Sequence, residues 1–175
     1  MNDRRLLREL ELELQKLVDK ECWMMSAGEG TGSRVGLDFG RKIPRKRPLP
    51  GIHLSEEKRN FIGEYWLFIS DCAWRIDSET GPVCSWCDGN ANDGPMVQTL
   101  RRLIGSRITS VSISPCALDL SIIFNNLLQL KLFCDQVNIP TNVDPEDIDN
   151  YIFTTPESLY VIGVRSAIQK RDRDR

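Results

Sequence analysis

Residues Leu118–Cys134 read LDLSIIFNNLLQLKLFC, two alternating apolar runs separated by a pair of asparagines. Strict alternation is typical of half-buried β-strands, so the segment predicts a hairpin. The apolar side chains of both runs fall on even positions: Leu118, Leu120, Ile122, Phe124, Leu128, Leu130, Leu132 and Cys134. A two-residue turn would mix the faces, whereas a three-residue loop, Asn125–Leu127, pairs Phe124 with Leu128 and keeps one buried face. We therefore expect the longer loop, with an asparagine in the left-handed region.

Other short runs of β-branched and aromatic residues continue this pattern on both sides of the hairpin. They include Cys22–Ser26, Arg34–Gly40, Glu64–Ser70 and Ile108–Ile113. Runs of this kind, bounded by glycine, proline and polar residues, are typical of antiparallel strands. With one N-terminal and one central helix, they predict an α+β fold whose mostly antiparallel sheet has about eight or nine short strands.

The N-terminal helix is predicted over residues 3–20, where charged residues surround a single apolar stripe. The stripe is formed by Leu7, Leu10, Leu14 and Leu17, at helical spacing. We expect this stripe to pack on the helix's own domain. A role in dimerisation or in binding a partner helix is the alternative.

The central helix is predicted at about residues 94–104. Asp93 is placed to cap it, Pro95 lies in its first turn and Gly105 lies just beyond its end. One face of this helix collects Met96, Val97, Leu100, Leu103 and Ile104. We expect that face to be buried.

The domain organisation follows from these elements. We expect an amphipathic helix over residues 1–20, a single α+β domain over 21–170 and a disordered tail, RDRDR, over 171–175. The chain has 175 residues and a net charge of −2, and its N-terminus is charged throughout. Because it has no apolar run of about 18 residues and no signal-peptide pattern, a cytoplasmic protein is expected.

Charge is unevenly distributed along the chain. Residues 21–60 carry eight Lys/Arg and five Asp/Glu, whereas residues 61–100 carry one Arg and six Asp/Glu. The basic run is Arg41, Lys42, Arg45, Lys46 and Arg47, and its prolines predict an exposed, extended ribbon. An acidic loop is expected over 136–149 and contains Asp144, Glu146, Asp147 and Asp149. These two runs are the candidate partner-binding residues. The alternative for the basic run is a solvated loop that pairs with acidic segments of the same chain, and the alternative for the acidic run is a solvated loop that also caps a short helix.

The glycine-rich stretch at residues 28–33, GEGTGS, raises the question of a phosphate-binding loop. Such a loop needs a helix directly after it. Here the following residues, RVGLDFG, alternate like a strand, no lysine follows Gly32, and Glu29 would repel a phosphate. The sequence favours a hairpin turn, with an anion-binding nest as the alternative.

Catalytic and metal-binding signals are weak. The six cysteines are Cys22, Cys72, Cys84, Cys87, Cys116 and Cys134, and the only histidine is His53. Cys84 and Cys87 have the spacing of a zinc or redox pair, but no second pair accompanies them. We expect buried, reduced thiols, no cofactor, no metal and no catalytic residue, with metal and redox roles for this pair as alternatives.

Two segments together resemble a bacterial protein family of uncharacterised activity. CWMMSAGEGTGSRVGLDFGRKIPRKRPL, followed by GEYWLFISDCAWRID, is similar to members with GxGTGS, GxKIPR and GEYxLFIxxCxWR motifs. LRRLIGSRITSVSI and LDLSIIFNNLLQLKLF resemble a small β-rich domain associated with bacterial defence and toxin-immunity neighbourhoods. The resemblance covers roughly residues 22–165. It implies a fold family and a neighbourhood, and it supplies no catalytic residues.

The sequence therefore predicts a non-enzymatic, cytoplasmic protein-binding module, and the resemblance implies an immunity protein that neutralises a bacterial toxin. The acidic segments 61–100 and 135–149 would suit a basic partner such as a nuclease toxin, because complementary charge speeds association. The alternative is a nucleic-acid-binding accessory or defence protein that uses the basic run at 41–47. No membrane contact is expected.

Overall fold

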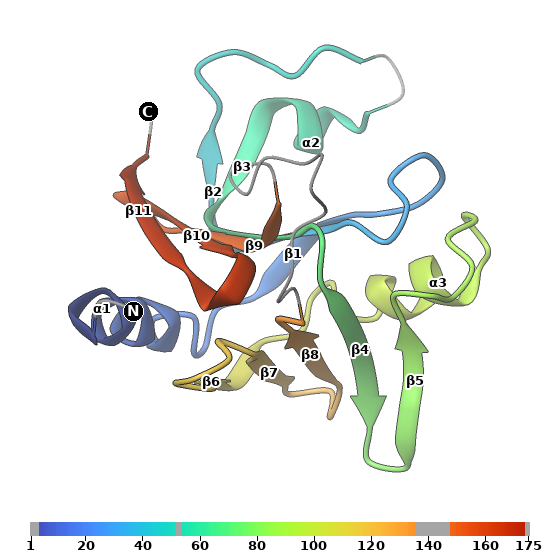
Figure 1. Ribbon diagram of the computed structural model, residues 1–175. Coiled ribbons are helices and arrows are strands. Elements are labelled where there is room, and N and C mark those ends of the chain that lie inside the picture. Colours follow the sequence, from blue (N-terminus) through green and yellow to red (C-terminus); the bar gives the residue numbers. More distant parts are fainter. Residues whose placement is uncertain (1–3, 52–53, 136–147, 174–175) are drawn as a thin grey trace.

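The computed structural model describes residues 4–51, 54–135 and 148–173 and consists of two antiparallel sheets with helices around them (Figure 1). The six-stranded sheet has the order β1 (Cys22–Ser26), β2 (Val35–Pro44), β3 (Phe61–Ile69), β9 (Asp149–Thr154), β10 (Ser158–Gly163) and β11 (Ile168–Asp172). The five-stranded sheet has the order β5 (Gly81–Ser85), β4 (Ala73–Ser78), β8 (Gln129–Phe133), β7 (Leu120–Phe124) and β6 (Ile108–Ile113). The helices are α1 (Arg4–Gln15), α2 (Glu56–Asn60), α3 (Pro95–Arg101) and the short 3₁₀ turn η2 (Val164–Ser166).

The α+β class and the antiparallel pairing are confirmed, but the strand count and the single sheet are wrong. The described residues form eleven strands in two sheets, and α2 is a third α-helix that the sequence pattern did not predict. No described helix has both the length and the apolar character needed to cross a membrane.

The hairpin formed by β7 and β8 in the five-stranded sheet has the predicted register. Leu120 pairs with Leu132 and Ile122 with Leu130, and the amide of Phe124 donates to the carbonyl of Leu128 over 2.9 Å. The left-handed residue is Leu127, with φ 66°, so the expectation of an asparagine there is wrong.

Both asparagines use their side chains to hold the loop instead. The side-chain oxygen of Asn125 accepts the amide of Arg107, and the side-chain amide of Asn126 donates to the carbonyl of Arg102 over 2.7 Å. The remaining position, Leu127, takes the positive φ and leaves its side chain exposed.

The core lies between the two sheets and is closed by helices. Leu10, Leu14 and Leu17 belong to the same buried cluster as Trp74, Phe124 and Tyr151 from the sheets. The N-terminal helix thus packs on its own domain, as the stripe predicted. It is shorter than the expected 3–20, because α1 ends at Gln15 and Leu17 lies in the turn that follows. Gln15 at the end of α1 also donates a hydrogen bond to the carbonyl of Val111 in β6.

The basic run is partly strand. β2 continues to Pro44, and Lys42, Ile43 and Pro44 pair with the first residues of β3. Residues 41–44 are exposed and extended, as expected of the ribbon, but they belong to β2 because β3 begins early enough to pair with them. α2 precedes β3, and the hydroxyl of Ser55 caps it by accepting the amide of Lys58.

The central helix begins at Pro95 as expected, but Asp93 does not cap it. The N-cap is Gly94, which makes no side-chain hydrogen bond. A Cβ at Gly94 would lie 2.6 Å from the carbonyl oxygen of Gly89, so the tight turn excludes a side chain there. The helix ends at Arg101, and of the two predicted core residues beyond it Leu103 is buried, whereas Ile104 is 44% exposed.

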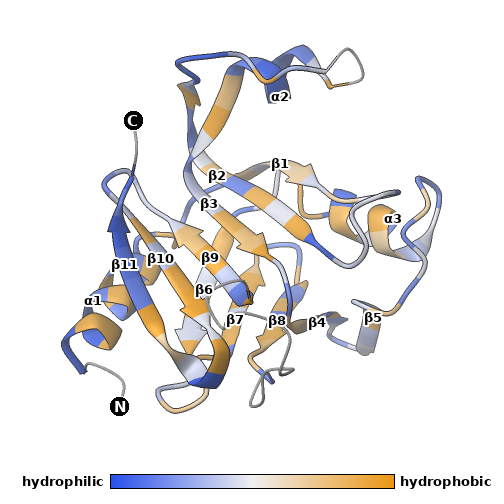
Figure 2. Ribbon diagram, turned by 45° about the horizontal axis from the view of Figure 1, so that its top comes forward, coloured by the Kyte–Doolittle hydropathy of each residue, from blue (hydrophilic) through white to orange (hydrophobic). Residues whose placement is uncertain are grey.

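The C-terminal segment joins the six-stranded sheet, so the expectation of a disordered tail is wrong for residues 171–173, and residues 174–175 lie outside the described residues. β11 runs to Asp172, which pairs with Ser158 of β10. Figure 2 shows β11 as a hydrophilic strand beside the hydrophobic β10. Backbone pairing at the sheet edge holds this segment even though its side chains are charged.

Candidate functional site

A bulge in β2 shapes the surface around the basic run. Phe39 pairs with Tyr65 and Lys42 pairs with Gly63, so two residues of β2 lie opposite Glu64 alone. Gly40 occupies the bulge with φ +75°, and a Cβ there would lie 2.8 Å from a carboxylate oxygen of Glu64. The bulge turns the following residues of β2 away from the main sheet.

Asp38 stabilises this bulge through a hydrogen bond to β3. Its carboxylate accepts the amide of Gly63 over 2.7 Å, and its side chain is buried. Burial raises the pKa of Asp38, although that hydrogen bond and the positive charges of Arg45 and Lys58 oppose the shift. The close packing leaves no room for a side chain at position 63, where a Cβ would lie 2.4 Å from the carbonyl of Tyr65.

Glu64 is the acidic centre of the bulge. Its carboxylate accepts hydrogen bonds from the Lys20 ammonium at 3.3 Å, the Arg41 guanidinium at 3.2 Å and the Arg41 amide at 3.3 Å. Burial raises the pKa of Glu64, but these bonds outweigh it and the net shift is downward. Glu64 is therefore held ionised between two cations.

A basic cleft lies on one side of this ion pair and encloses about 510 Å³. This basic cleft is lined by Arg41, Ile43, Pro44, Arg45, Lys46, Arg47, Ile62, Glu64, Pro156 and Arg173. Ile43 and Ile62 are cross-strand partners and give the cleft an apolar floor. The lining thus combines five cations and one carboxylate with aliphatic side chains.

Backbone carbonyls hold two of the five cations in place. The guanidinium of Arg173 donates to the carbonyls of Gly63, Glu64 and Thr155, and the Nε of Arg45 donates to the carbonyl of Phe61 over 2.9 Å. Lys46 and Arg47 are exposed at the rim, and no salt bridge joins them to a carboxylate of the described residues. The cleft consequently keeps an excess of positive charge.

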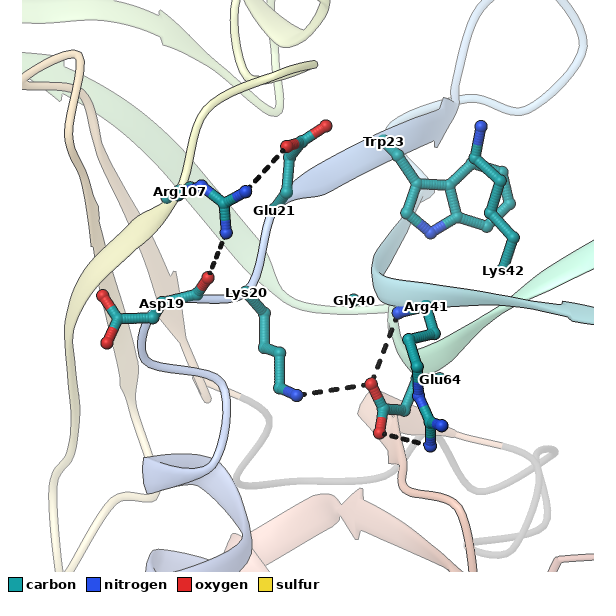
Figure 3. Close-up of a pocket in the computed structure, with 9 residues that line it drawn as sticks. All are labelled: Asp19, Lys20, Glu21, Trp23, Gly40, Arg41, Lys42, Glu64 and Arg107. Atoms are coloured by element: carbon teal, nitrogen blue, oxygen red, sulfur yellow. Dashed lines mark hydrogen bonds and ion pairs between the residues drawn. The ribbon is translucent and has the colours of Figure 1, made fainter.

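A second, charged cleft of about 350 Å³ lies on the other side of Glu64 (Figure 3). It shares Arg41 and Glu64 with the basic cleft and adds Asp19, Lys20, Glu21, Trp23, Gly40, Lys42 and Arg107. Arg107 donates to the carbonyl of Asp19 at 2.8 Å and to the carboxylate of Glu21 at 3.3 Å. Four cations and three carboxylates therefore line this cleft, and most of them are paired with one another.

Lys42 belongs to this second cleft, so the five predicted cations do not act as one group. Its ammonium lies 5.1 Å from the ring centroid of Trp23 and pairs with Glu57. Alternate residues of a strand point to opposite faces, which separates Lys42 from Ile43 and Arg45 of the basic cleft, whereas Arg41 lines both clefts. The sequence also missed Ile62, Glu64, Pro156 and Arg173, although the alternation Arg41, Ile43, Arg45 was a visible sign of a mixed face.

The acidic candidates do not join the basic run. Asp144, Glu146 and Asp147 lie outside the described residues, and Asp149 begins β9, whereas Pro156 of the basic cleft follows the other end of that strand. In the acidic segment 61–100, three of the six carboxylates form ion pairs: Glu64, Asp71 with Arg34, and Asp77 with Arg75 and Lys131.

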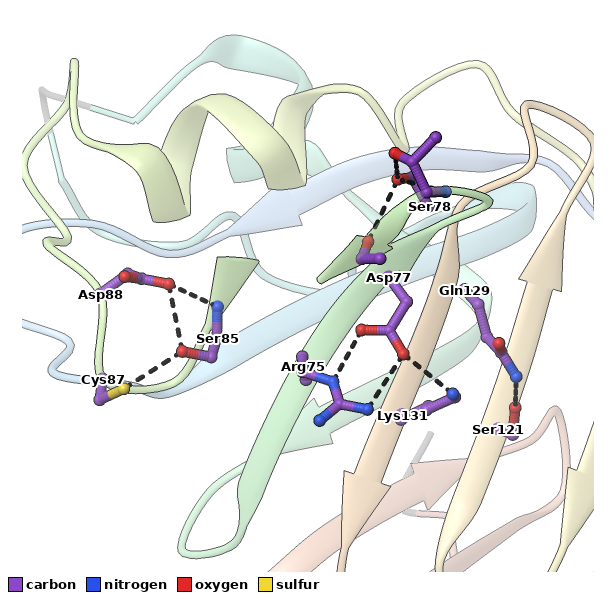
Figure 4. A network of polar contacts seen from close by, with 11 residues as sticks. Arg75, Asp77, Ser78, Ser85, Cys87, Asp88, Ser121, Gln129 and Lys131 are labelled. Atoms are coloured by element: carbon purple, nitrogen blue, oxygen red, sulfur yellow. Dashed lines mark hydrogen bonds and ion pairs between the residues drawn. The ribbon is translucent and has the colours of Figure 1, made fainter. Parts of the chain in front are cut away.

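Asp77 is the clearest of these internal pairs (Figure 4). Its carboxylate lies 2.7 Å from the Nε of Arg75 and 2.9 Å from the ammonium of Lys131. Burial raises the pKa of Asp77, but the bonds from both cations outweigh it and lower the pKa overall. Much of the negative charge of this segment is thus used within the protein, and less remains for a basic partner.

The GEGTGS stretch is the tip of the β1–β2 hairpin, as predicted. Gly28, Gly30 and Gly32 all have positive φ, and the side-chain amide of Asn90 donates to the carbonyls of Gly28 and Gly32. The tip precedes Val35, whereas the basic cleft lies at the Pro44 end of this ten-residue strand, about 30 Å away. The loop and the basic cleft therefore do not form one surface.

The cysteines form no metal cluster in the part of the chain that the structure describes. All six thiols are free; Cys84 is buried, which raises its pKa to about 11, and Cys87 is exposed. His53 lies outside the described residues. The two members of the CxxC pair consequently face different environments.

Comparisons with protein-family models, with curated proteins and with solved structures find no match to this chain.

Proposed function

We propose that this protein is a non-enzymatic protein-binding module whose basic cleft holds an acidic, partly apolar segment of its partner. The observation that carries the proposal is the lining of the cleft, where five cations and a single carboxylate surround the Ile43–Ile62 floor. Carboxylates of a partner would pair with the guanidinium groups, and an aliphatic side chain would cover the two isoleucines.

A protein partner suits this lining better than a nucleic acid does. Proteins that bind single strands stack bases on aromatic rings, and none of the residues lining the basic cleft is aromatic. The net charge of −2 also gives the whole chain no general attraction to a polyanion. An acidic protein segment would meet both the local positive charge and the apolar floor.

The proposal changes the kind of partner that the acidic segments favoured. Glu64, Asp71 and Asp77 are engaged with cations of the same chain, so segment 61–100 offers less negative charge to a basic partner. The resemblance to proteins of toxin-immunity neighbourhoods makes a toxin the partner class that we propose, with the acidic surface on the toxin. The role is inhibition by binding, without catalysis.

The test is binding to the protein encoded by the adjacent gene, measured by calorimetry and on a sizing column. Lys46→Glu/Arg47→Glu reverses two exposed rim charges and should weaken binding at least tenfold. Arg8→Glu/Arg102→Glu is the matched control, because it changes the net charge equally at exposed positions outside the cleft. Equal weakening by both variants would contradict a site at the basic cleft, and no complex with the wild type would contradict this partner class.

A nucleic-acid-binding accessory is the second candidate, because Arg45, Lys46, Arg47 and Arg173 line one continuous surface. The same variants distinguish it when a 20-nucleotide single strand and the corresponding duplex serve as probes. Binding that falls steeply with salt and is lost in Lys46→Glu/Arg47→Glu would favour this candidate over the protein-binding module.

A further inference from the structure

Cys72 and Cys134 lie at one end of the β4–β8 pair in the five-stranded sheet. β4 and β8 are antiparallel, and Ala73 pairs with Phe133 at the end of their ladder. One further position along that register brings Cys72 opposite Cys134. Cys72 directly precedes β4, and Cys134 directly follows β8.

The backbone hydrogen bonds show that Cys72 and Cys134 are opposed as a non-hydrogen-bonded pair of the antiparallel strands. The amide of Cys134 donates to the carboxylate of Asp119 over 2.7 Å and is not used between the strands. Residues opposite each other without such bonds have Cα atoms about 4.5 Å apart and their side chains close together. That separation lies within the range of Cα distances that a disulfide spans, about 4.4–6.8 Å.

The side chains share one small environment. The thiol of Cys134 and the hydroxyl of Tyr151 both donate to the carbonyl of Leu118, over 3.4 and 3.0 Å. Cys72 is 5% exposed and Cys134 is half-buried, so an oxidant reaches Cys134 first. Burial raises the pKa of Cys72 to about 12 and also raises that of Cys134, where the neighbouring Cys72 contributes to the shift.

We propose that Cys72 and Cys134 are a disulfide-forming pair, oxidised in the folded protein by a low-molecular-weight disulfide such as oxidised glutathione. Both thiols are free in the structure, which therefore represents the reduced form. The pair is distinct from the CxxC motif, whose members Cys84 and Cys87 face different environments.

The reaction balances as two thiol–disulfide exchanges. The Cys134 thiolate attacks one sulfur of oxidised glutathione; the glutathione S–S bond breaks, a mixed disulfide forms, and the first glutathione thiolate leaves and takes up a proton. The Cys72 thiolate then attacks the sulfur of Cys134, forming the protein disulfide and releasing the second glutathione. Two protein thiols are oxidised, and one oxidised glutathione is reduced to two molecules of glutathione.

Tryptic mapping tests the pair directly. Trypsin releases Cys72 in residues 60–75, Cys134 in residues 132–165, and Cys84 with Cys87 together in residues 76–101. After folded wild-type protein is incubated with oxidised glutathione at pH 8.5 and excess thiol is blocked, we expect a cross-linked 60–75/132–165 peptide. Its mass should be about 2 Da below the sum of the two reduced peptides, since two hydrogen atoms are lost.

Two variants and one internal marker make the result decisive. Cys134→Ser should remove the cross-link, whereas Cys116→Ser, which changes an exposed thiol, should retain it. In the wild type, a mixed disulfide on exposed Cys116 shows that the oxidant is active. Glutathionylated Cys116 without the 60–75/132–165 cross-link would overturn the proposal, as would a cross-link that forms only in denaturant.

Discussion

The carboxylates of Asp77 and Glu64 are each paired with one arginine and one lysine, but their surroundings differ. Asp77 is bound by Arg75 and Lys131 on the regular β4–β8 ladder, and Glu64 is bound by Lys20 and Arg41 at the β2 bulge. In both, the bonds from two cations outweigh burial and lower the pKa. Only Glu64 lies between two clefts and beside an excess of cations. The irregular backbone at the bulge, rather than the ion pair itself, therefore creates the candidate site.

Overpacking β3 beside the bulge should have the largest effect on stability. In Gly63→Ala the new Cβ would lie 2.4 Å from the carbonyl of Tyr65 and 2.8 Å from the amide nitrogen of Phe39. We expect a loss of about 3 kcal/mol in the free energy of unfolding, as in overpacked cores. Chemical denaturation measures this loss. Gly89→Ala is the control, because its Cβ would have only one neighbour, at 3.8 Å, and it should cost less than about 1 kcal/mol.

Neutralising the two carboxylates should separate stability from binding. Glu64→Gln and Asp77→Asn each weaken charge-assisted hydrogen bonds, so we expect each to cost about 1–2 kcal/mol of unfolding free energy. Only Glu64→Gln should also tighten binding of an acidic partner, because it removes the one carboxylate that lines the basic cleft. Calorimetry on both variants checks this, and equal effects on binding would show that the two ion pairs do not differ as described.

The pH dependence of stability should differ in sign between Glu64 and Asp38. The pKa of Glu64 is lowered by folding, so its contribution is present above the unfolded pKa and is lost as the pH falls through the folded value. The pKa of Asp38 is raised, so its ionisation costs stability as the pH rises through the unfolded pKa toward the folded one.

Glu64→Gln and Asp38→Asn test the opposite signs of these two pH dependences. Between pH 6 and pH 3, Glu64→Gln should lose less stability than the wild type, and Asp38→Asn should lose more, because protonation of Asp38 partly protects the wild type. The asparagine side chain keeps an oxygen that accepts the Gly63 amide, so the Asp38→Asn variant is expected to fold. Urea denaturation at each pH gives the two slopes, and parallel slopes would refute the assignment.

The smallest effect should come from Lys42. Lys42→Ala removes an exposed ion pair with Glu57 and a contact with the Trp23 ring, and it should cost about 0.5 kcal/mol of unfolding free energy. It should leave partner binding unchanged, whereas Lys46→Ala should weaken it. A matching loss of affinity in both variants would place Lys42 in the basic cleft after all.

Local sequence patterns were sufficient to predict several individual elements. Period-two alternation set the register of the β7–β8 hairpin, because a shift of one residue would expose its whole apolar face. The leucine stripe of α1 and the turn at GEGTGS followed from equally local patterns. The cations of the basic run could also be read from the sequence, but which of them line the basic cleft could not.

The candidate site, in contrast, depends on how distant segments of the chain pack together. Arg41 lines both clefts and its neighbour Lys42 lines only the charged one, because a strand turns alternate side chains to opposite faces. Arg173 reaches the cleft from a tail that composition marked as disordered, because backbone pairing with β10 outweighs its charge. Contacts over more than 100 residues, such as Arg173 with Gly63, depend on strand order, and no local pattern encodes that order.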